Sequence, residues 1–569
     1  MQKRNQLIYV LGTLFLLGGM ALFYQYIIDP SQTNTGAHPT KNNPAPLSSS
    51  ADHDLFGKYD KPIDMTVYAG INDVMKFAPN ESIDDNFHTR IQMKYLNIHY
   101  INKWVADGSK INERLNLAIA NNDLPDVIQV DISQLNRLIR NGQIQDLTGI
   151  WEDYASEALK QNMGYQDNAA FLPATKDKKI YGIPLPYDAG NHTAMMYIRK
   201  DWLSKLGLNP PTTYEELRAV AKAFVEQDPD GNSKNDTFAF SMDQGSAEGG
   251  IGGFTFEALA AAFHAYPRSW IRESNGSAAY GGIQPEMKEA LAAVQDFYLM
   301  GAIEPEFPIH DLPKSMQRVI NGKVGIVFGP FYYPLWPLKD TLQNDPKADW
   351  LVLPIPGKGG EKVVPRSVIS TNNWVVVRKG YEHPEALVKS MNLYFAMQEG
   401  IGEVGQLWRE ANSGTYKDMS IHLYAKPYAF DSPNRNMQTG KQILETIDHN
   451  DESYLKTQAA KDNYFQNIKP GGLSGWGFRK VFYDAERVLA QYDKVQYSMF
   501  FGAPTPTMIV KGNALAKLEY EMYNEIIMGA PLSKFDDFTA LWRTYGGDDI
   551  TTEVNAWARA NTSLRGGTP

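Results

Sequence analysis

Residues 178–224 read KKIYGIPLPYDAGNHTAMMYIRKDWLSKLGLNPPTTYEELRAVAKAF, and this stretch decides the fold class. Two short apolar runs, IYGIPL (180–185) and AMMYIR (194–199), have the length and composition of buried strands. They are followed by TYEELRAVAKAFVEQ (213–227), whose apolar residues recur at helical spacing. Strands that alternate with helices are typical of βαβ units, so the stretch predicts an α/β protein with mainly parallel sheets.

The same alternation continues on both sides of this stretch. We expect further helices at 112–122, 285–301 and 383–398, each with apolar residues along one face. The expected strands are DMTVYAG (64–70), LNIHYI (96–101), DVIQV (126–130), TFAFSM (237–242), VGIVFG (324–329), WLVLPI (350–355) and WVVVRK (374–379).

Length and charge limit the classes of protein that the chain can belong to. A chain of 569 residues is too long for one hydrophobic core and predicts at least two domains. Its 65 acidic residues exceed its 55 basic residues, which gives a net charge of −10. A broad basic surface is therefore absent, and we expect no nucleic-acid partner.

The amino terminus has the features of an export signal or a membrane anchor. Lys3 and Arg4 precede an apolar run from Leu7 to Ile28, which as a helix would span about 33 Å. The basic residues would stay in the cytoplasm, so the body would lie outside the cell. Residues 1–28 are expected to be an uncleaved anchor, although Gly19-Met20-Ala21 also offers the small-x-small spacing of a signal-peptidase site.

Residues 29–60 are rich in Ser, Thr, Asn and Pro and contain few apolar side chains. Such a segment cannot bury enough apolar surface to fold, so we expect a disordered tether. The chain has no cysteine, which excludes disulfides, thiolate metal sites and cysteine nucleophiles. A lipid cannot be attached through an amino-terminal cysteine either.

The segment DPDGNSKNDTF, residues 228–238, places oxygen-bearing side chains at alternate positions. A loop that curls around Ca²⁺ presents such positions inward, because this hard cation takes six to eight oxygen ligands. An EF-hand would have Gly at the sixth position and Glu at the twelfth, where this chain has Ser233 and Ala239. Two interpretations remain, a calcium loop and a solvated polar turn.

Several segments, taken in order, resemble the extracellular solute-binding proteins of ABC importers, in particular the large sugar-binding group of Gram-positive bacteria. The most specific combination is YGIP, YIRKDWLSKLGL and PPTTYEEL within residues 181–217. The other matching segments are DLPDVIQV (123–130), LIRNGQIQDLT (138–148), DPDGNSKNDT (228–237), NGKVGIVFGPFYY (321–333) and residues 504–557.

The resemblance implies a two-lobed type II periplasmic-binding-protein fold with a ligand cleft between the lobes, which close around the ligand by a hinge motion. We place the crossings near Pro186, Val327 and Asn373. One lobe would comprise 62–186 and 327–372, and the other 187–326 and 373–569. The implied partners are an oligosaccharide and the permease subunits of an ABC importer, with the protein acting as a monomer on the extracellular face of the membrane.

The resemblance also bears on the polar loop, because some members of this family carry a structural Ca²⁺ at this position. Thr237 replaces a second acidic residue that family loops often have, which would lower the affinity or leave a water in the shell. The ligands carried over to this chain are Asp228, Asp230, Asn232, the carbonyl of Lys234, and Asp236.

A sugar offers apolar faces edged with hydroxyl groups, so a site for it combines aromatic rings with fixed hydrogen-bonding groups. The chain has 11 Trp and 31 Tyr. The aromatic candidates are those flanked by Gly, Pro or polar residues or placed at strand ends. The expected ligand-binding residues are Asp131, Tyr187, Asp188, Trp270, Phe331, Tyr332, Trp336, Asn373, Trp374, Trp408 and Trp476, with His192 as a weaker candidate.

Each candidate also has an ordinary structural interpretation. Asp131 follows the strand 126–130 and would equally serve as the cap of a helix that begins at Ser133. Trp374 could be a buried hinge residue, and two of the four aromatic residues in GPFYYPLW (329–336) could pack inside the lobe.

We predict a binding protein and not an enzyme. The chain contains no GxSxG, HExxH, Walker-type or dinucleotide-binding motif. A glycosidase would need two carboxylates held about 5–10 Å apart, which the sequence alone cannot place. The alternatives are a membrane-tethered sugar sensor or adhesin on the same fold and, third, a sugar-active enzyme.

Overall fold

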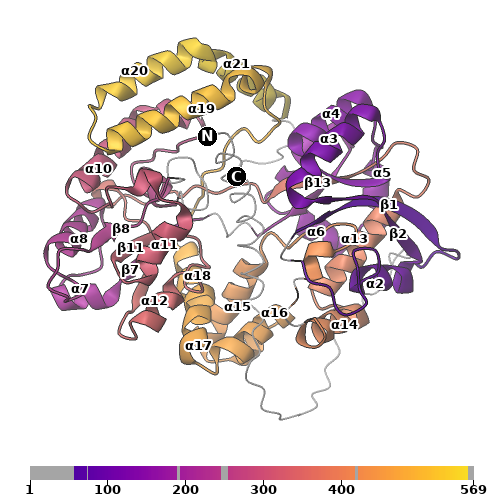
Figure 1. The fold of residues 1–569 in the computed structure, drawn as a ribbon, viewed down its shortest axis with the longest axis horizontal. Helices are drawn as coiled ribbons and strands as arrows, with labels where there is room; N and C mark the ends of the chain where they lie inside the picture. The colour runs from indigo at the N-terminus through magenta and orange to yellow at the C-terminus, as the bar shows by residue number, and fades with distance from the viewer. Residues whose placement is uncertain are drawn as a thin grey trace. The chain divides into compact units, whose positions relative to one another are not determined.

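The computed structural model describes residues 57–72, 75–188, 193–244, 254–416, 419 and 421–561 (Figure 1). The chain divides into two compact units. Unit 1 comprises the chain up to Tyr187 together with Ser370–Pro433, and unit 2 comprises Asp188–Ile369 together with Asn434–Pro569. The segments expected to be an anchor and most of the tether lie outside the described residues, as does His192.

Unit 1 contains two small sheets. Strands β1 (Ile63–Ile71) and β2 (Ile98–Asp107) pair in parallel. The second sheet has the order β3 (Val127–Asp131), β13 (Thr371–Val377), β6 (Ile183–Pro186), with β13 antiparallel to both neighbours. The remaining elements are α2 (Phe87–Leu96), η1 (Gly108–Lys110), α3 (Ile111–Asn121), α4 (Ile132–Asn141), α5 (Thr148–Tyr154), α6 (Glu157–Met163), η2 (Ala169–Ala174), β4 (Thr175–Lys176), β5 (Lys179–Ile180), α13 (Glu385–Gln398), α14 (Gly402–Ser413) and η8 (Ile421–Tyr424).

Unit 2 is built on a four-stranded sheet of order β12 (Trp350–Leu353), β7 (Met195–Arg199), β11 (Val324–Gly329), β8 (Phe238–Phe240). Every residue of β7 and β11 is buried. The helices in the first part of unit 2 are α7 (Lys200–Leu206), α8 (Tyr214–Glu226), α9 (Phe254–Ala261), η5 (Gly281–Ile283), α10 (Pro285–Leu299), η6 (Phe307–Ile309), α11 (Leu312–Ile320), α12 (Leu338–Asn344) and η7 (Lys358–Gly360), and a hairpin joins β9 (Trp270–Arg272) to β10 (Ala278–Tyr280).

The described part of unit 2 after Asn434 is almost entirely helical. Helix α19 packs against α20 and α21, and the three are drawn in yellow in Figure 1. The elements of this part of unit 2 are α15 (Arg435–His449), η9 (Glu452–Tyr454), α16 (Gln458–Asp462), η10 (Asn463–Ile468), α17 (Gly472–Arg479), η11 (Lys480–Asp484), α18 (Ala485–Leu489), α19 (Pro506–Ile527), α20 (Ser533–Trp542), η12 (Arg543–Gly547) and α21 (Asp548–Asn561).

The structure confirms the α/β class but corrects the expectation of mainly parallel sheets. Strand β7 is antiparallel to both of its neighbours, β11 and β12, and β13 is antiparallel to β3 and β6. The consecutive strands β11 and β12 run in the same direction but do not pair with each other, because β7, from an earlier part of the chain, lies between them. Periodicity along the sequence does not reveal such an insertion.

The division of the chain also differs from the expected lobes. Residues 327–369 belong to unit 2 and not to the first lobe, because β11 and β12 both pair with β7. Residues 373–433 belong to unit 1, because β13 pairs with β3 and β6. The chain therefore passes between units next to Tyr187, Ser370 and Asn434, and not at Val327.

Gly325 allows the helices of unit 2 to approach the central strand β11 closely. A Cβ at this position would lie 2.3 Å from Phe224 Cδ2 of α8 and 2.7 Å from Trp202 Cε3 of α7. Both aromatic side chains are fully buried, so neither can move without disturbing the core.

We therefore expect Gly325→Ala to lower the free energy of unfolding by about 1–3 kcal/mol, the usual cost of an overpacked core. The measurement is chemical denaturation of residues 57–569. The control is Gly149→Ala in α5, where a Cβ meets no atom within 4 Å and alanine favours the helix. Equal stability of the two variants would contradict the packing argument.

Candidate functional site

Three of the expected binding residues lie together at one edge of the β3–β13–β6 sheet in unit 1. Asp131, the last residue of β3, is paired in register with Asn373 of β13. Tyr187 directly follows β6, and its backbone N–H donates to the carbonyl of Ser370, 2.8 Å away. All three side chains are partly exposed. We call Asp131, Tyr187 and Asn373 the polar edge.

Asp131 caps helix α4, which is the structural role considered above. Its Oδ1 accepts a hydrogen bond from the backbone N–H of Gln134 at 2.8 Å, and Gln134 Oε1 accepts from the N–H of Asp131 at 3.0 Å. This capping box fixes the carboxylate at the sheet edge. Burial raises the pKa of the Tyr68 hydroxyl, and the negative charge of Asp131 raises it further. Asp131 is therefore close enough to Tyr68 for the two groups to interact electrostatically.

Trp374 and Trp408 belong to the core of unit 1 and not to a binding surface. Trp374 is 3% exposed, and its Nε1 donates to the carbonyl of Ala170 at 2.8 Å. Trp408 is 7% exposed and packs against Phe87 and His88. Apolar burial rather than ligand contact therefore accounts for both side chains.

Three further candidates are buried in unit 2. Phe331 is 3% exposed, and Trp270 is 5% exposed with its ring centroid 5.2 Å from that of Tyr280. Asp188 is 2% exposed, and its Oδ2 accepts a hydrogen bond from the backbone N–H of Asn436 at 2.9 Å. Asp188 thus satisfies an N–H in the first turn of α15, where a negative charge is favourable.

Tyr332, Trp336 and Trp476 remain partly exposed, and the two segments that carry them are in contact. A Cβ at Gly477 would lie 2.9 Å from Leu335 Cδ2, so α17 packs directly on the 329–336 segment. We call residues 329–336 and 471–478 the aromatic segments. Lys480 Nζ lies 5.9 Å from the centroid of the Trp476 ring, and burial raises the pKa of the Tyr332 hydroxyl.

The loop 228–236 forms a tight turn around its own first carboxylate. Asp228 accepts hydrogen bonds from the backbone N–H groups of Gly231, Asn232 and Ser233, each at 3.0 Å. Ser233 has φ +62°, the left-handed conformation for which the EF-hand sequence reserves glycine. The sharp turn of a calcium loop is therefore present although serine occupies its sixth position.

Two of the expected calcium ligands, Asp230 and Asp236, meet at the side chain of Asn232, whose own Oδ1 accepts from the backbone N–H of Lys234 at 2.7 Å. Asn232 Nδ2 donates to Asp230 Oδ2 at 2.7 Å and to Asp236 Oδ1 at 3.0 Å. Lys323, which sequence reasoning missed, donates from Nζ to the same two oxygens, both at 2.9 Å. The hydrogen bond from Lys323 is the larger cause, and the one from Asn232 the second, that holds the pKa of Asp236 below its usual value.

The donor set fits a hard cation. Three carboxylates, one amide oxygen and one carbonyl can supply the oxygen ligands that Ca²⁺ prefers, whereas Ala239 offers no carboxylate at the twelfth position and is fully buried. Asp230 and Asp236 already lie close enough to share one ammonium group.

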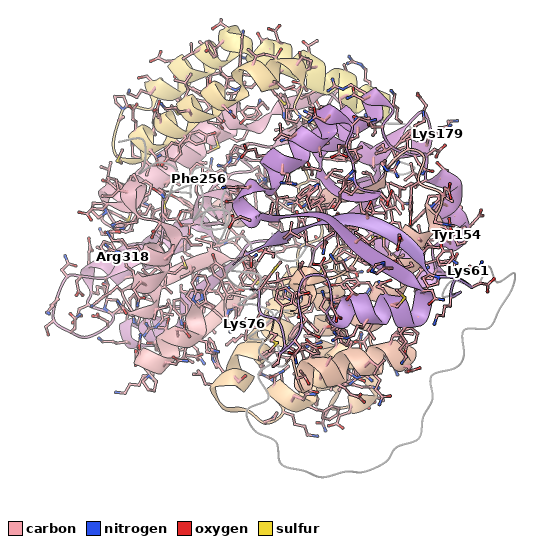
Figure 2. All side chains as sticks on the ribbon, turned by 45° about the vertical axis from the view of Figure 1, so that its right-hand side comes forward. Lys61, Lys76, Tyr154, Lys179, Phe256 and Arg318 are labelled. Atoms are coloured by element: carbon pink, nitrogen blue, oxygen red, sulfur yellow. The ribbon has the colours of Figure 1, made fainter. Side chains whose placement is uncertain are left out.

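A second group of possible metal ligands, also missed from the sequence, consists of Glu304, Glu306 and His310. His310 is fully buried, with Nδ1 2.6 Å from Glu304 Oε2 and Nε2 3.4 Å from Glu306 Oε2. Arg318 of α11, labelled in Figure 2, pairs with the other oxygen of Glu304. The ion pair with Arg318 compensates the charge of Glu304 without a metal ion. The spacing Glu-x-Glu-x₃-His was the available sequence signal.

Residues 99–398 match the family described as bacterial extracellular solute-binding protein. The match extends over more than half of the chain, so the chain belongs to this family. Membership confirms the predicted class, an extracellular solute-binding protein and not an enzyme.

Three curated proteins are similar to this chain in sequence. The chain is 24% identical to lipoprotein LipO of Bacillus subtilis over 84% of this chain and 90% of LipO. It is 30% identical to the polygalacturonan/rhamnogalacturonan-binding protein YtcQ of the same organism over 40% of this chain and 43% of YtcQ. It is 27% identical to the fructooligosaccharide ABC transporter substrate-binding protein FusA of Streptococcus pneumoniae over 46% of this chain and 49% of FusA.

Solved structures support the fold. An EF-hand mutant of S. pneumoniae FusA in complex with fructo-nystose aligns with 88% of this chain and all of its own chain, at 18% identity and a TM-score of 0.58. The alginate-binding protein AlgQ2, solved without calcium ion, aligns with 88% of this chain and 99% of its own, at 17% identity and a TM-score of 0.56.

Within the part of the chain that the structure describes, no helix is long and apolar enough to cross a membrane. The apolar run Leu7–Ile28 lies outside that part.

Proposed function

We propose that this protein captures an oligosaccharide outside the cell and delivers it to the permease of an ABC importer. The observation that carries the proposal is the pair of aromatic segments, which present Tyr332, Trp336 and Trp476 partly exposed on adjoining elements of unit 2. Aromatic faces of this kind stack on the apolar C–H faces of sugar rings. The similarity to YtcQ, a polygalacturonan/rhamnogalacturonan-binding protein, and to FusA, a fructooligosaccharide-binding protein, supports a carbohydrate ligand.

Within unit 1, the polar edge offers hydrogen-bonding groups that suit the hydroxyl groups of a sugar. The Asp131 carboxylate accepts hydrogen bonds from hydroxyl groups, and the Asn373 amide and the Tyr187 hydroxyl both donate and accept. The capping box of α4 and the pairing of β3 with β13 hold Asp131 and Asn373 in place before any ligand arrives. Fixed polar groups of this kind determine which sugar hydroxyls are accepted.

Loss of the exposed tryptophans tests the carbohydrate function. We expect Trp336→Ala and Trp476→Ala each to weaken oligosaccharide binding at least tenfold, which corresponds to about 1.4 kcal/mol. The measurement is isothermal titration calorimetry of residues 57–569 with fructooligosaccharides and pectic oligosaccharides, after a thermal-shift screen.

The matched control is Tyr545→Ala, since Tyr545 is an aromatic residue of unit 2 that is 43% exposed and lies outside the aromatic segments. Unchanged affinity in both tryptophan variants would exclude the aromatic segments as the site. Reaction products that accumulate during prolonged incubation would exclude a function limited to binding.

We also propose that the loop 228–236 binds a structural Ca²⁺ through Asp228, Asp230, Asn232, the Lys234 carbonyl and Asp236. The left-handed turn at Ser233 and the convergence of the Asp230 and Asp236 carboxylates support this assignment, as do the solved structures of a FusA EF-hand mutant and of AlgQ2 without calcium ion. Bound calcium would stabilise the connection between α8 and β8 by linkage to folding.

Calcium is therefore expected to raise the melting temperature of the wild-type protein and to leave its sugar affinity nearly unchanged. Asp230→Ala should remove most of that thermal shift, because it deletes one ligand at the centre of the loop. Differential scanning calorimetry in calcium and in chelator measures the effect, and Mg²⁺ at the same concentration controls for ionic strength. An Asp230→Ala variant that responds fully would place the calcium elsewhere.

For attachment to the cell, we propose that the protein acts as a monomer anchored by the apolar segment Leu7–Ile28, because the chain has no cysteine to carry a lipid. The full-length protein should fractionate with membranes and resist extraction by high salt. Mature protein that begins at Leu22 in the culture medium would show instead that the segment is cleaved.

A further inference from the structure

The position of Lys323 beside the loop 228–236 is set by strand pairing. Lys323 directly precedes β11, which runs parallel to β8, and Val324 is paired in register with Phe238. The backbone N–H of Phe238 donates to the Lys323 carbonyl at 2.8 Å. Because the loop ends immediately before β8, this pairing brings the lysine alongside the end of the loop. The two segments are far apart in the sequence.

The Lys323 ammonium bridges two of the expected calcium ligands. Nζ lies 2.9 Å from Asp230 Oδ2 and 2.8 Å from Asp236 Oδ2. The Lys323 side chain is 30% exposed and that of Asp230 only 17%, so this ion pair is partly shielded from water. It joins the third and the ninth positions of the loop, as a bound metal ion would.

A second lysine contacts the backbone on the other side of the loop. Lys205 Nζ, from the last turn of α7, donates to the carbonyl of Asp228 at 2.9 Å and to that of Pro229 at 3.2 Å. The carboxylates of Asp230 and Asp236 are opposed by the ammonium group of Lys323. Because Lys323 lies between them, these two carboxylates do not require a metal ion to offset their repulsion.

We propose that Lys323 is the resident cation of this loop and that calcium binds only by displacing its ammonium group from Asp230 and Asp236. This inference rests on the proposed calcium loop and specifies how the chain regulates it. An ammonium and a divalent cation cannot share the same two carboxylates without strong repulsion at such short distances. Lys323 therefore lowers the calcium affinity, and it keeps the loop folded when calcium is scarce.

Removal of the ammonium group tests the proposal. In Lys323→Met, calcium should bind at least tenfold more tightly than in the wild type, and the melting temperature in chelator should fall by several degrees. Calcium should then restore the lost stability. Calcium titration calorimetry measures the affinity, and scanning calorimetry with and without chelator measures the stability. Lys323→Gln, whose amide can still donate to a carboxylate, serves as the second variant if the first does not fold.

The matched control is Lys222→Met, which removes the same charge from an exposed side chain of α8, the helix that leads into the loop. Its calcium affinity should change less than threefold. If Lys323→Met and Lys222→Met raise the affinity equally, the effect is general electrostatics and the displacement proposal is wrong.

Two further outcomes separate this inference from the proposed calcium loop. If the wild type binds calcium and Lys323→Met binds it no more tightly, the calcium loop stands and the role of Lys323 is refuted. If neither Lys323 variant nor the wild type binds calcium at millimolar concentration, the calcium loop itself is refuted. If the Lys323 variants bind calcium and the wild type does not, the result supports the proposal that Lys323 blocks the calcium site.

Discussion

Antiparallel insertion of one remote strand into each main sheet is the constraint on which the rest of the structure depends. In unit 1, β13 lies between β3 and β6, and in unit 2, β7 lies between β11 and β12. Each inserted strand donates and accepts backbone hydrogen bonds on both sides, so it cannot be removed without exposing two unpaired strand edges. The central position is also the most buried, which explains the Trp374–Val377 run and the continuous burial of β7.

The insertion of β13 also builds the polar edge. Asp131 and Tyr187 are 56 positions apart in the sequence and follow different strands, but the amino end of β13 meets the carboxyl ends of both β3 and β6. In unit 2, side-chain packing and not strand pairing brings the two aromatic segments together, since Gly477 lies against Leu335. The proposed binding groups of unit 1 therefore lie on or directly beside paired strands.

The loop 228–236 illustrates how tertiary contacts change the meaning of a motif. Its alternating oxygens resemble a cation site, and the turn at Ser233 has the conformation that such a site needs. The structure adds Lys323, whose ammonium group already engages the carboxylates of Asp230 and Asp236, and Lys205, which donates to the backbone carbonyl of Asp228. Whether Lys323 or a metal ion neutralises the loop carboxylates thus depends on the pairing of β8 with β11, which the sequence of the loop does not reveal.

The sequence by itself determined the α/β class, the family resemblance and most of the strands. The run 324–329 is β11 with the expected bounds, and the helices at 213–227 and 285–301 appear as α8 and α10 with small changes at their ends. These elements were predictable because their signals are local periodicity and turn residues. The eight helices that the structure describes in α14–α21 were largely missed, because the interpretation there relied on resemblance and not on periodicity. Only the tertiary structure decided which aromatic residues are buried, that Asp188 caps α15, and that Lys323 reaches Asp230. Burial and ion pairing depend on which distant segments pack together, and short-range sequence patterns carry no record of those partners.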